Sequence, residues 1–451
     1  MDRRAFLASC AAIGALALPD FIRRAGAQDQ AKVRALTGAY NESGQQLFQA
    51  FAAAPGNIVF SPYSIGTAMA MALAGARAET EREMAAALKH RLARAEIADA
   101  NAAVLATLNG YGKRGEEARC VVPEMRLNGE RCEHEPLADG ACPPPTRREG
   151  ELCVTPASLP PHAGLLVANA LMLTRNDGLV SKDYAALIEQ KYAGEIFRNA
   201  GLNDVNGWVA RRTEGKIDKI IDRLDPKAAA IILNAAYFKA NWASTFSKQA
   251  TRPEAFSLST AQQVEVPTMH KVAAYAVAVQ SGYRAIRLPY SISAIGMIIV
   301  VPDAVDGFAT VTARLGAQEL SDLFALLRTA SVKSVSLALP RFKSAFQTDL
   351  VPPLQLAGMR LAFDRERADF SGMAGRPAAE GGLVIDQIAH RAAIDVDEDG
   401  TEAAAATGIT FTRTSAVLSP EPLRVDRPFL YYIVDDATGA ILFQGRVVDP
   451  R

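Results

Sequence analysis

Hydrophobic positions in the first part of the chain recur at helical spacing. Over residues 31–51 they predict an amphipathic helix, which Pro55-Gly56 ends. A short apolar run at 57–60 predicts a strand, and Ser61 followed by proline predicts the start of a helix over 63–76. That helix is apolar on nearly every side, so we expect it to be buried.

Later in the chain, short apolar runs typical of strands become common. Further helices are predicted at 80–88, 93–108, 183–192 and 205–212. Strands are predicted at 165–173, 231–238, 264–266, 283–288, 296–301, 335–339, 384–388, 392–396, 429–434 and 441–448. The run 231–238 is almost continuously apolar, which favours a buried central strand. Early helices and late strands predict the α+β class, with one large domain built around mostly antiparallel sheets.

The charge balance limits the partners of the protein. The chain has 451 residues, of which 49% are hydrophobic, and it carries 49 basic and 49 acidic side chains. A formal charge of zero disfavours nucleic acid or an anionic membrane as the main partner, because both require a basic surface. Outside the N-terminus there is no apolar run of about twenty residues, so we expect no membrane span.

The segment 1–27 has the features of an export signal. Arg3-Arg4 precedes an apolar run, and Ala25-Gly26-Ala27 offers a small-residue cleavage site. The paired arginines resemble a bacterial twin-arginine signal. Cys10 stands before most of the apolar run, which disfavours a lipoprotein signal. We therefore expect a single mature domain, 28–451, exported to the periplasm or the extracellular space.

Residues 112–163 differ from the rest of the chain, with crowded prolines and mixed charges. The cysteines downstream of the predicted signal all lie here, and they are Cys120, Cys132, Cys142 and Cys153. An even number in an exported protein predicts two disulfides, whose pairing the sequence leaves open. The spacing lacks the Cys-x-x-Cys pairs of zinc ribbons, so we expect no metal. We interpret 112–163 as a disulfide-linked insertion without a core of its own.

Residues 397–427 combine an acidic opening with a run of small side chains. The opening contains Glu398, Asp399, Gly400, Thr401 and Glu402, and the run of small side chains contains Ala403, Ala404, Ala405 and Ala406. One interpretation is a helix start, with Asp399 and Glu402 as a capping box. The other is a strand in which Thr401, Ala403 and Ala405 face one side, so that it could slide between two existing strands.

The sequence carries no recognisable signal for catalysis. It has no Gly-x-Ser-x-Gly elbow, His-Glu-x-x-His, Walker loop or Gly-x-Gly-x-x-Gly fingerprint, so we expect neither an enzyme nor a cofactor. Of the five histidines, only His270 and His390 lie beside apolar strands. A lone histidine in such a place is usually a hydrogen-bonded structural group.

Several separated segments together resemble the serpin family. They are residues 57–65, 233–242, 388–406, 426–430 and 441–450, in the family's order. They match the approach to the long buried helix, the central strand with its tryptophan, the strand and hinge before the reactive loop, and the C-terminal signature. The resemblance covers nearly the whole mature chain except the insertion. It implies the serpin fold, with large mostly antiparallel sheets, a cluster of helices and an exposed reactive-centre loop.

The resemblance implies a suicide-substrate inhibitor of serine, or sometimes cysteine, proteases. The protease attacks the loop and forms a covalent acyl-enzyme, and the cleaved loop inserts into the large sheet before deacylation. Thr401 and the small residues Ala403 to Ala406 fit this use, because a large or charged inward side chain would have to be buried. We expect a monomer whose partner is the target protease. The alternative is a non-inhibitory serpin that acts as a carrier or protein-binding module through the cysteine-rich insertion.

The resemblance also assigns two internal sites. The shutter, a polar cluster beneath the strands that part, would contain Ser61, Ser64, Asn234 and His390. Hydroxyl, amide and imidazole groups can exchange hydrogen bonds while strands separate. Trp242 would mark the breach, where the loop first enters the sheet, and a large core aromatic is an equally good description of it.

The position of the reactive bond depends on how the loop is counted. Counting from Gly400 places Thr414 before the cleaved bond and Ser415 after it. A loop one residue shorter presents Arg413-Thr414, suited to a trypsin-like pocket that holds an acidic group. Counting back from Pro428 ends near Val417. We take Arg413, Thr414 and Ser415 as the candidates.

Overall fold

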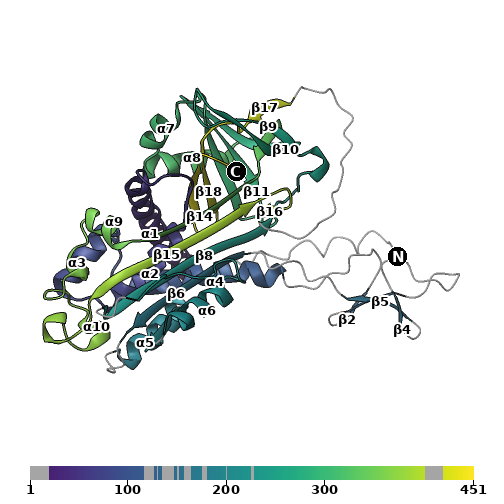
Figure 1. The fold of residues 1–451 in the computed structure, drawn as a ribbon. Coiled ribbons are helices and arrows are strands. Elements are labelled where there is room, and N and C mark those ends of the chain that lie inside the picture. The colour runs from purple at the N-terminus through teal and green to yellow at the C-terminus, as the bar shows by residue number, and fades with distance from the viewer. Residues whose placement is uncertain are drawn as a thin grey trace, which may run out of the picture.

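The computed structural model describes most of the chain. The described residues are 20–115, 126–128, 131–134, 147–149, 152–156, 164–174, 180–199, 201–224, 228–401 and 420–451. Figure 1 shows long strands crossing the middle of the molecule, with helices on both sides of them. Within the described ranges, no helix is long and apolar enough to cross a bilayer.

The predicted helices are present, with ends shifted by a few residues. The helices are α1 (Asp20–Phe51), α2 (Pro62–Gly75), α3 (Ala78–Ala87), α4 (Arg94–Gly115), α5 (Lys182–Tyr192), α6 (Leu202–Arg212), α7 (Phe308–Arg314), α8 (Ala317–Thr329), α9 (Val351–Leu356) and α10 (Ser371–Ala374). Helix α1 begins before the position predicted for it, and α7 to α10 were not predicted. Ser61 caps α2 as expected, because its Oγ accepts a hydrogen bond from the Ser64 amide at 3.0 Å.

The large sheet has the strand order β14-β15-β16-β8-β6-β7. Its strands are β6 (Gly164–Leu173), β7 (Glu195–Arg198), β8 (Ala230–Asn241), β14 (Phe342–Asp349), β15 (Ile385–Val396) and β16 (Gly400–Thr401). The pairs β8–β15 and β6–β7 are parallel, and the other pairs are antiparallel. The strands predicted at 384–388 and 392–396 are in fact one continuous strand, β15, which passes through His390.

A second sheet has the order β1-β19-β18-β12-β11-β10-β13-β17, with β9 paired to β10. Its strands are β1 (Ile58–Phe60), β9 (Arg252–Ser257), β10 (Gln263–Gln280), β11 (Tyr283–Pro289), β12 (Ile295–Pro302), β13 (Lys333–Pro340), β17 (Glu421–Arg424), β18 (Phe429–Asp435) and β19 (Ile441–Val447). A small separate sheet, in the order β2-β3-β5-β4, lies within the predicted insertion. It contains β2 (Arg126–Asn128), β3 (Arg131–His134), β4 (Arg147–Glu149) and β5 (Leu152–Pro156). The α+β prediction is therefore confirmed.

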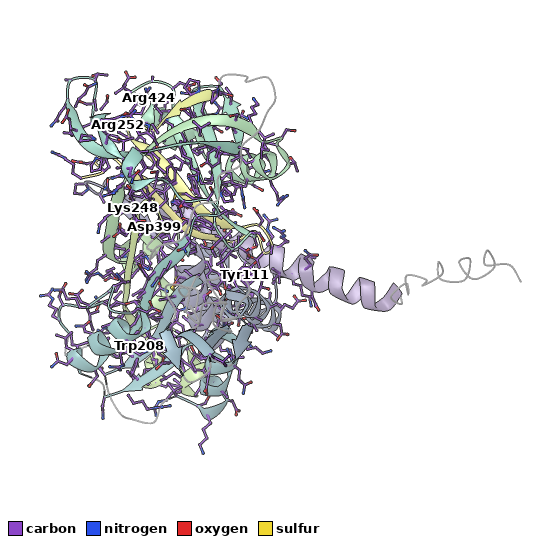
Figure 2. The ribbon with its side chains drawn as sticks, turned by 90° about the vertical axis from the view of Figure 1, so that its right-hand side faces the viewer. Tyr111, Trp208, Lys248, Arg252, Asp399 and Arg424 are labelled. Atoms are coloured by element: carbon purple, nitrogen blue, oxygen red, sulfur yellow. The ribbon has the colours of Figure 1, made fainter. Side chains whose placement is uncertain are left out.

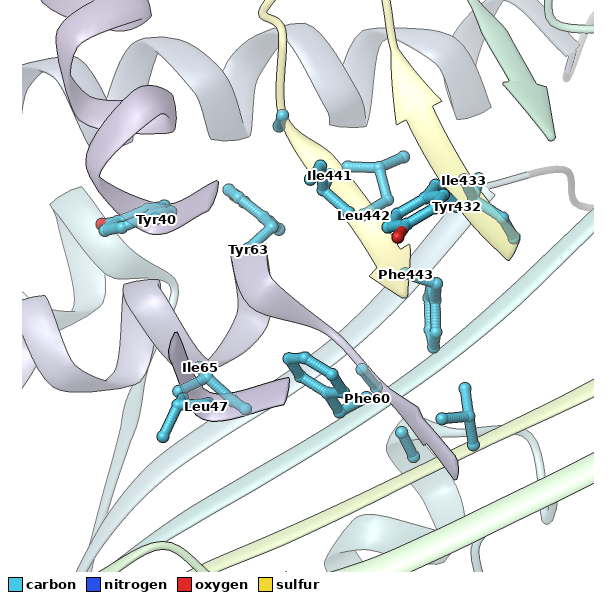
Figure 3. Packing of buried hydrophobic residues seen from close by; sticks show 14 of the residues in the cluster. Tyr40, Leu47, Phe60, Tyr63, Ile65, Tyr432, Ile433, Ile441, Leu442 and Phe443 are labelled. Atoms are coloured by element: carbon cyan, nitrogen blue, oxygen red, sulfur yellow. The ribbon is translucent and has the colours of Figure 1, made fainter. Parts of the chain in front are cut away.

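The main core lies between the two larger sheets and the helices α1 and α2. Every residue of α2 is buried, as its all-round apolar pattern predicted. Figure 3 shows Phe60 in this core, with Leu47 of α1 and Ile65 of α2 on one side of it and Phe443 of β19 on the other. The ring of Phe443 from β19 lies 6.2 Å from that of Phe238 in β8, so aromatic contacts connect the two sheets.

A second hydrophobic cluster covers the opposite face of the large sheet. Helix α6 and the segment after it, residues 213–224, bury Ile217, Ile220 and Ile221 against β6 and β8. Along β8, Ile231, Leu233 and Ala235 belong to this outer cluster, whereas the alternate residues Ala230, Ile232, Ala236, Phe238 and Ala240 belong to the main core. Burial on both faces explains why the sequence of β8 is almost continuously apolar.

Gly66 provides a test of the α1–α2 packing. A Cβ at this position would lie 2.3 Å from the ring of Tyr40, which is itself buried and hydrogen-bonded through its hydroxyl to Asn101. We expect Gly66→Ala to lower the free energy of unfolding by about 1–3 kcal/mol, although alanine is the better helix former. The measurement is urea or thermal denaturation. The matched control is Gly38→Ala, because Gly38 is exposed in α1 with nothing near its Cβ position. That variant should be as stable as the wild type or slightly more so, and equal losses in both variants would contradict the packing argument.

Candidate functional site

The contact between β8 and β15, which we call the seam, organises the candidate site. The two strands pair in parallel from Ala230 with Ile385 to Tyr237 with Ala393. They run side by side in Figure 1. Above this stretch the short strand β16 lies between them, pairing antiparallel with both. Thr401 is opposite Ala240 on one side and opposite Val396 on the other. The seam is therefore already open to a third strand at its upper end.

The turn that leads into β16 is held by Asp397. Its Oδ1 accepts hydrogen bonds from the amides of Asp399 and Gly400 at 2.9 and 3.2 Å. The Asp397 amide in turn donates to the Gly400 carbonyl at 2.9 Å. Gly400 passes so close to β8 that a Cβ would lie 2.2 Å from the Ala240 carbonyl oxygen. Glycine is required here because of this close approach.

Aromatic side chains line the upper end of the seam beneath Thr401. The rings of Trp242 and Tyr290 stack with centroids 4.5 Å apart. The Tyr290 hydroxyl lies 2.6 Å from Thr401 Oγ1, and Trp242 Nε1 donates to the Asp397 carbonyl at 2.9 Å. Trp242 thus lies where the chain joins the sheet, in the location expected from the resemblance, and its role there stays a prediction.

The acidic pair before Gly400 fastens the hinge to the body of the protein. The buried Glu398 carboxylate accepts hydrogen bonds from Arg341 Nε at 2.8 Å and from the Thr251 hydroxyl. Burial opposes ionisation, but these hydrogen bonds hold the pKa of Glu398 below its ordinary value. Asp399 pairs with Lys248 at 2.7 Å, and Figure 2 shows the two residues together near the middle of the molecule.

Of the two interpretations of this stretch, the structure supports the strand for the residues it describes. Gly400–Thr401 forms β16 instead of the first turn of a helix. The predicted helix start at Asp399 is wrong, because the Thr401 backbone pairs with Ala240 and Val396 across the seam. Tertiary pairing therefore overrides the local capping signal.

The predicted shutter residues come together beneath the seam. Asn234 Nδ2 donates to the Ser64 hydroxyl at 2.7 Å and to the Ser64 carbonyl at 2.9 Å. It also lies within hydrogen-bond distance of Asn169 Oδ1, and Asn234 Oδ1 pairs with His390 Nδ1. Ser61 takes part indirectly, through its cap on α2. Asn169 was not predicted, although its sequence context is the same as that of Asn234, because each is a single amide side chain in an apolar strand.

His390 is fully buried and neutral. Because the Asn234 amide group already donates to its other partners, the Asn234 oxygen accepts from His390 Nδ1–H. The other ring nitrogen, Nε2, has no hydrogen-bond partner within the described part of the chain. Burial lowers the pKa of His390 to about 3. His390 is thus a buried acceptor at the seam, available to a new donor.

The remaining predicted site residues lie outside the described residues. They are Glu402, Ala403, Ala404, Ala405, Ala406, Arg413, Thr414, Ser415, Cys120 and Cys142. Cys132 lies in β3 and Cys153 in β5, two strands that pair antiparallel. Of the segment 1–27, only the backbone from residue 20 is described. The export signal, the disulfides and the reactive bond therefore stay predictions.

Other functional candidates were missed because only the fold brings them together. Tyr290, Thr251 and Arg341 contact the hinge from distant parts of the sequence. Their own local sequence carries no signal for this role. In the described part of the chain, no group of three or more histidine, cysteine or acidic side chains is arranged to hold a metal ion.

The close approach of Gly400 predicts the effect of adding a methyl group there. In Gly400→Ala the new Cβ would clash with the Ala240 carbonyl, so we expect β16 to leave the seam. Hydrogen exchange of the amides from 397 to 401 should then become about tenfold faster or more. Gly110→Ala is the control, because nothing lies near the Cβ position of Gly110 in α4. Unchanged exchange in Gly400→Ala would refute the assignment of this contact.

The neutral state of His390 predicts a specific pH dependence. Between pH 6.5 and about 3 the unfolded chain binds a proton at this residue and the folded chain does not. The free energy of unfolding is therefore not reduced by His390 above pH 6.5. It falls as the pH decreases below 6.5, because a proton on His390 stabilises only the unfolded chain. The free energy of unfolding should decrease between about pH 7.5 and 5.5 by about 1.4 kcal/mol more in the wild type than in His390→Gln. Urea denaturation at the two pH values measures this difference, and parallel changes would show that His390 is not held neutral.

Comparisons with known proteins agree with this architecture. A family model described as serpin (serine protease inhibitor) matches residues 38–122 and 151–450, and the unmatched interval between them falls inside the predicted insertion 112–163. A serpin-like protein of Thermococcus kodakarensis is 30% identical over 428 residues, which cover 92% of this chain and 86% of that protein. Iripin-2 of Ixodes ricinus is 30% identical over 434 residues, which cover 93% of this chain and 94% of that protein. Among solved structures, the thermophilic serpin tengpin in its native state has a TM-score of 0.73 at 23% identity, covering 92% of this chain and 94% of that chain. The chain belongs to the serpin family, a family of protease inhibitors and not of catalytic enzymes.

Proposed function

We propose that this protein is an irreversible suicide-substrate inhibitor of serine proteases, with cysteine proteases as a second target class. The observation that carries the proposal is β16, which already pairs with both strands at the upper end of the seam. A protease that attacks the reactive loop would form an acyl-enzyme, and the cleaved loop would extend β16 down the seam. The attached protease is then carried with it before the acyl bond is hydrolysed.

The register of β16 indicates which loop residues would meet which parts of the seam. Thr401 lies opposite Ala240, so each further residue moves one position down β8. Thr407 would then face Asn234, and counting from Val396 along β15 places it opposite His390 as well. Its hydroxyl would offer a hydrogen bond to the unpartnered His390 Nε2. Thr407 would thus supply a new hydrogen-bond partner for the shutter at the level where insertion separates Asn234 from His390.

The same register explains the need for small side chains. Thr401 points into the core, where its hydroxyl contacts Tyr290, so Ala403 and Ala405 would also point inward. Insertion would replace one parallel pairing by two antiparallel ones, and antiparallel pairing is slightly more stable per residue. Short side chains allow this gain without opening the core around them.

The length of the seam supports a reactive bond near Arg413 or Thr414. Continued in register, the inserted strand reaches Ala230 at the lower end of the seam with residue 411. A cleaved bond after residue 413 or 414 therefore leaves enough chain to fill the whole seam. We also propose that residues 1–27 direct export to the periplasm or the extracellular space and that the working form is 28–451, because Arg3-Arg4, the apolar run after them and Ala25-Gly26-Ala27 have the features of an export signal.

A second candidate function is that of a carrier or protein-binding module. The small sheet β2-β3-β5-β4 favours it, because β2, β3 and β4 lie within 123–150, which the family model does not match, and β5 follows directly after that interval. In this case the loop would be cleaved without inserting.

The experiment is incubation of 28–451 with trypsin, elastase and subtilisin. We expect an SDS-stable complex with at least one protease, and sequencing of the released C-terminal fragment identifies the bond. Cleavage should raise the thermal midpoint, because the loop has become a new strand. The variant Thr401→Arg should be cleaved without forming a complex, since its charge would have to enter the core beside Tyr290.

The two candidate functions differ in one outcome. Cleavage by all three proteases with neither a stable complex nor a higher thermal midpoint would exclude the inhibitor and leave the binding module.

A further inference from the structure

Two charged side chains of β15 reach across the seam, one at its lower end and one on its outer face. They are Asp386 and Arg391, and neither was singled out from the sequence. We propose that Asp386 and Arg391 lock the seam and thereby set the rate at which the loop inserts. This inference rests on the proposed inhibitory function.

Asp386 ties β15 to the start of β8. Its Oδ2 accepts a hydrogen bond from the Ala229 amide at 2.5 Å, and the Ala230 amide lies 3.4 Å away. The register of the seam shifts between Ile385 and Gln387, so Asp386 is the extra residue of a bulge. A bulge re-aims a side chain, and here it directs the carboxylate at the partner strand instead of leaving it above the sheet.

The environment of Asp386 makes this tie stronger than an exposed one. Its side chain is only 11% exposed, and its other oxygen pairs with the Arg365 guanidinium. A hydrogen bond from a backbone amide to a carboxylate is charge-assisted, and limited solvent access screens it little. Arg365 keeps the carboxylate oriented, so the tie at Ala229 is held in one geometry.

Insertion down the full length of the seam must break this tie. A third strand at this level separates β8 from β15, and Asp386 can then no longer reach the Ala229 amide. Before cleavage, the same tie opposes spontaneous opening from below. Asp386 therefore resists the last part of insertion. The first part meets no such resistance, because β16 already separates β8 from β15 at the upper end of the seam.

Arg391 makes a second tie on the outer face. Its Nη1 donates to the Lys219 carbonyl at 2.6 Å and lies 3.2 Å from Asp218 Oδ1. Asp218 is 76% exposed, so the ion pair contributes little and the hydrogen bond to the carbonyl matters more. Residues 213–224 pack against β8 through Ile217, Ile220 and Ile221. The same outer cluster also contains Ala389 of β15, so this segment spans the seam, and Arg391 adds a hydrogen bond that ties β15 to it.

The proposal separates loop attack from loop insertion. Asp386 and Arg391 contact neither the hinge residues 397–401 nor β17, which follows the loop, in the hydrogen bonds and ion pairs of the described residues. Weakening them should leave the rate of acylation unchanged and accelerate insertion. A residue that merely stabilised the fold would not change how cleaved inhibitor divides between complex and free product.

The test compares Asp386→Ala, Asp386→Asn and Arg391→Ala with the wild type. One measurement is the number of inhibitor molecules cleaved per complex formed, using a protease that cleaves part of the wild type unproductively. The other is the rate at which inhibitory activity is lost spontaneously on mild heating. We expect fewer cleaved molecules per complex and about tenfold faster spontaneous loss for Asp386→Ala. Arg391→Ala should change both in the same direction, and Asp386→Asn, which keeps an acceptor oxygen, should be intermediate.

Asp349→Ala is the matched control. Asp349 Oδ1 accepts from the Ile388 amide at 3.2 Å, so it binds the same strand from the opposite edge and does not cross the seam. This variant should insert at the wild-type rate even if it is less stable. Equal acceleration in Asp349→Ala and Asp386→Ala would overturn the lock, because general loosening of β15 would explain both.

The outcomes distinguish the lock from the function on which it rests. If the wild type forms no complex and gains no thermal stability on cleavage, the inhibitory function itself fails. The second case is that the wild type inhibits while the Asp386 and Arg391 variants show its number of cleaved molecules per complex and its rate of spontaneous activity loss. In that case the lock is refuted and the inhibitory function stands. Should Asp386→Ala not fold, Asp386→Asn and Arg391→Ala still decide the question.

Discussion

The parallel pairing of β8 with β15 is the interaction on which the rest of the structure depends. Both faces of β8 are covered, by the main core on one side and by α6 with residues 213–224 on the other. Parallel pairing is slightly weaker per residue than antiparallel pairing. A strand added between the two, in the direction that β16 already takes, would form antiparallel pairs on both sides. An additional strand between β8 and β15 would therefore make the sheet more stable than it is in the closed state.

Buried polar groups are placed where this sheet would have to part. Asn169, Asn234 and His390 lie in or beside the seam, buried among mostly apolar side chains. Each buried polar group carries a desolvation cost that its hydrogen bonds offset. An all-apolar seam would avoid that cost, but it could not exchange partners when a strand with a hydroxyl enters. Among the described residues His390 Nε2 has no hydrogen-bond partner, so this cost is not fully offset there in the closed state.

The hinge shows a different balance of forces at the upper end of the seam. Glu398 is buried but ionised, because Arg341 and Thr251 hold its carboxylate. Trp242 and Tyr290 form a stacked floor beneath Thr401. The hinge is thus fastened by its acidic side chains while its backbone is already paired as a strand. This arrangement fixes both the direction and the register of any further strand.

The α+β class and most of the helices and strands followed from the sequence, because alternation and capping are local properties of consecutive residues. The shutter residues were named only by the resemblance to the serpin family, and the hydrogen bonds that join Ser64, Asn234 and His390 are tertiary contacts. The same local argument failed at Asp399, where a capping signal lost to pairing across the seam. It also divided β15 in two, since His390 interrupts the apolar pattern while its partner Asn234 lies far away in the chain. Asp386, Arg391 and Arg341 gained their roles only from the tertiary structure. The sequence alone determined that a run of small residues follows a glycine hinge, and the fold decided which charges and amides meet it. The physical reason is that side-chain size belongs to each residue, whereas hydrogen-bond and charge partners depend on segments that only folding brings together.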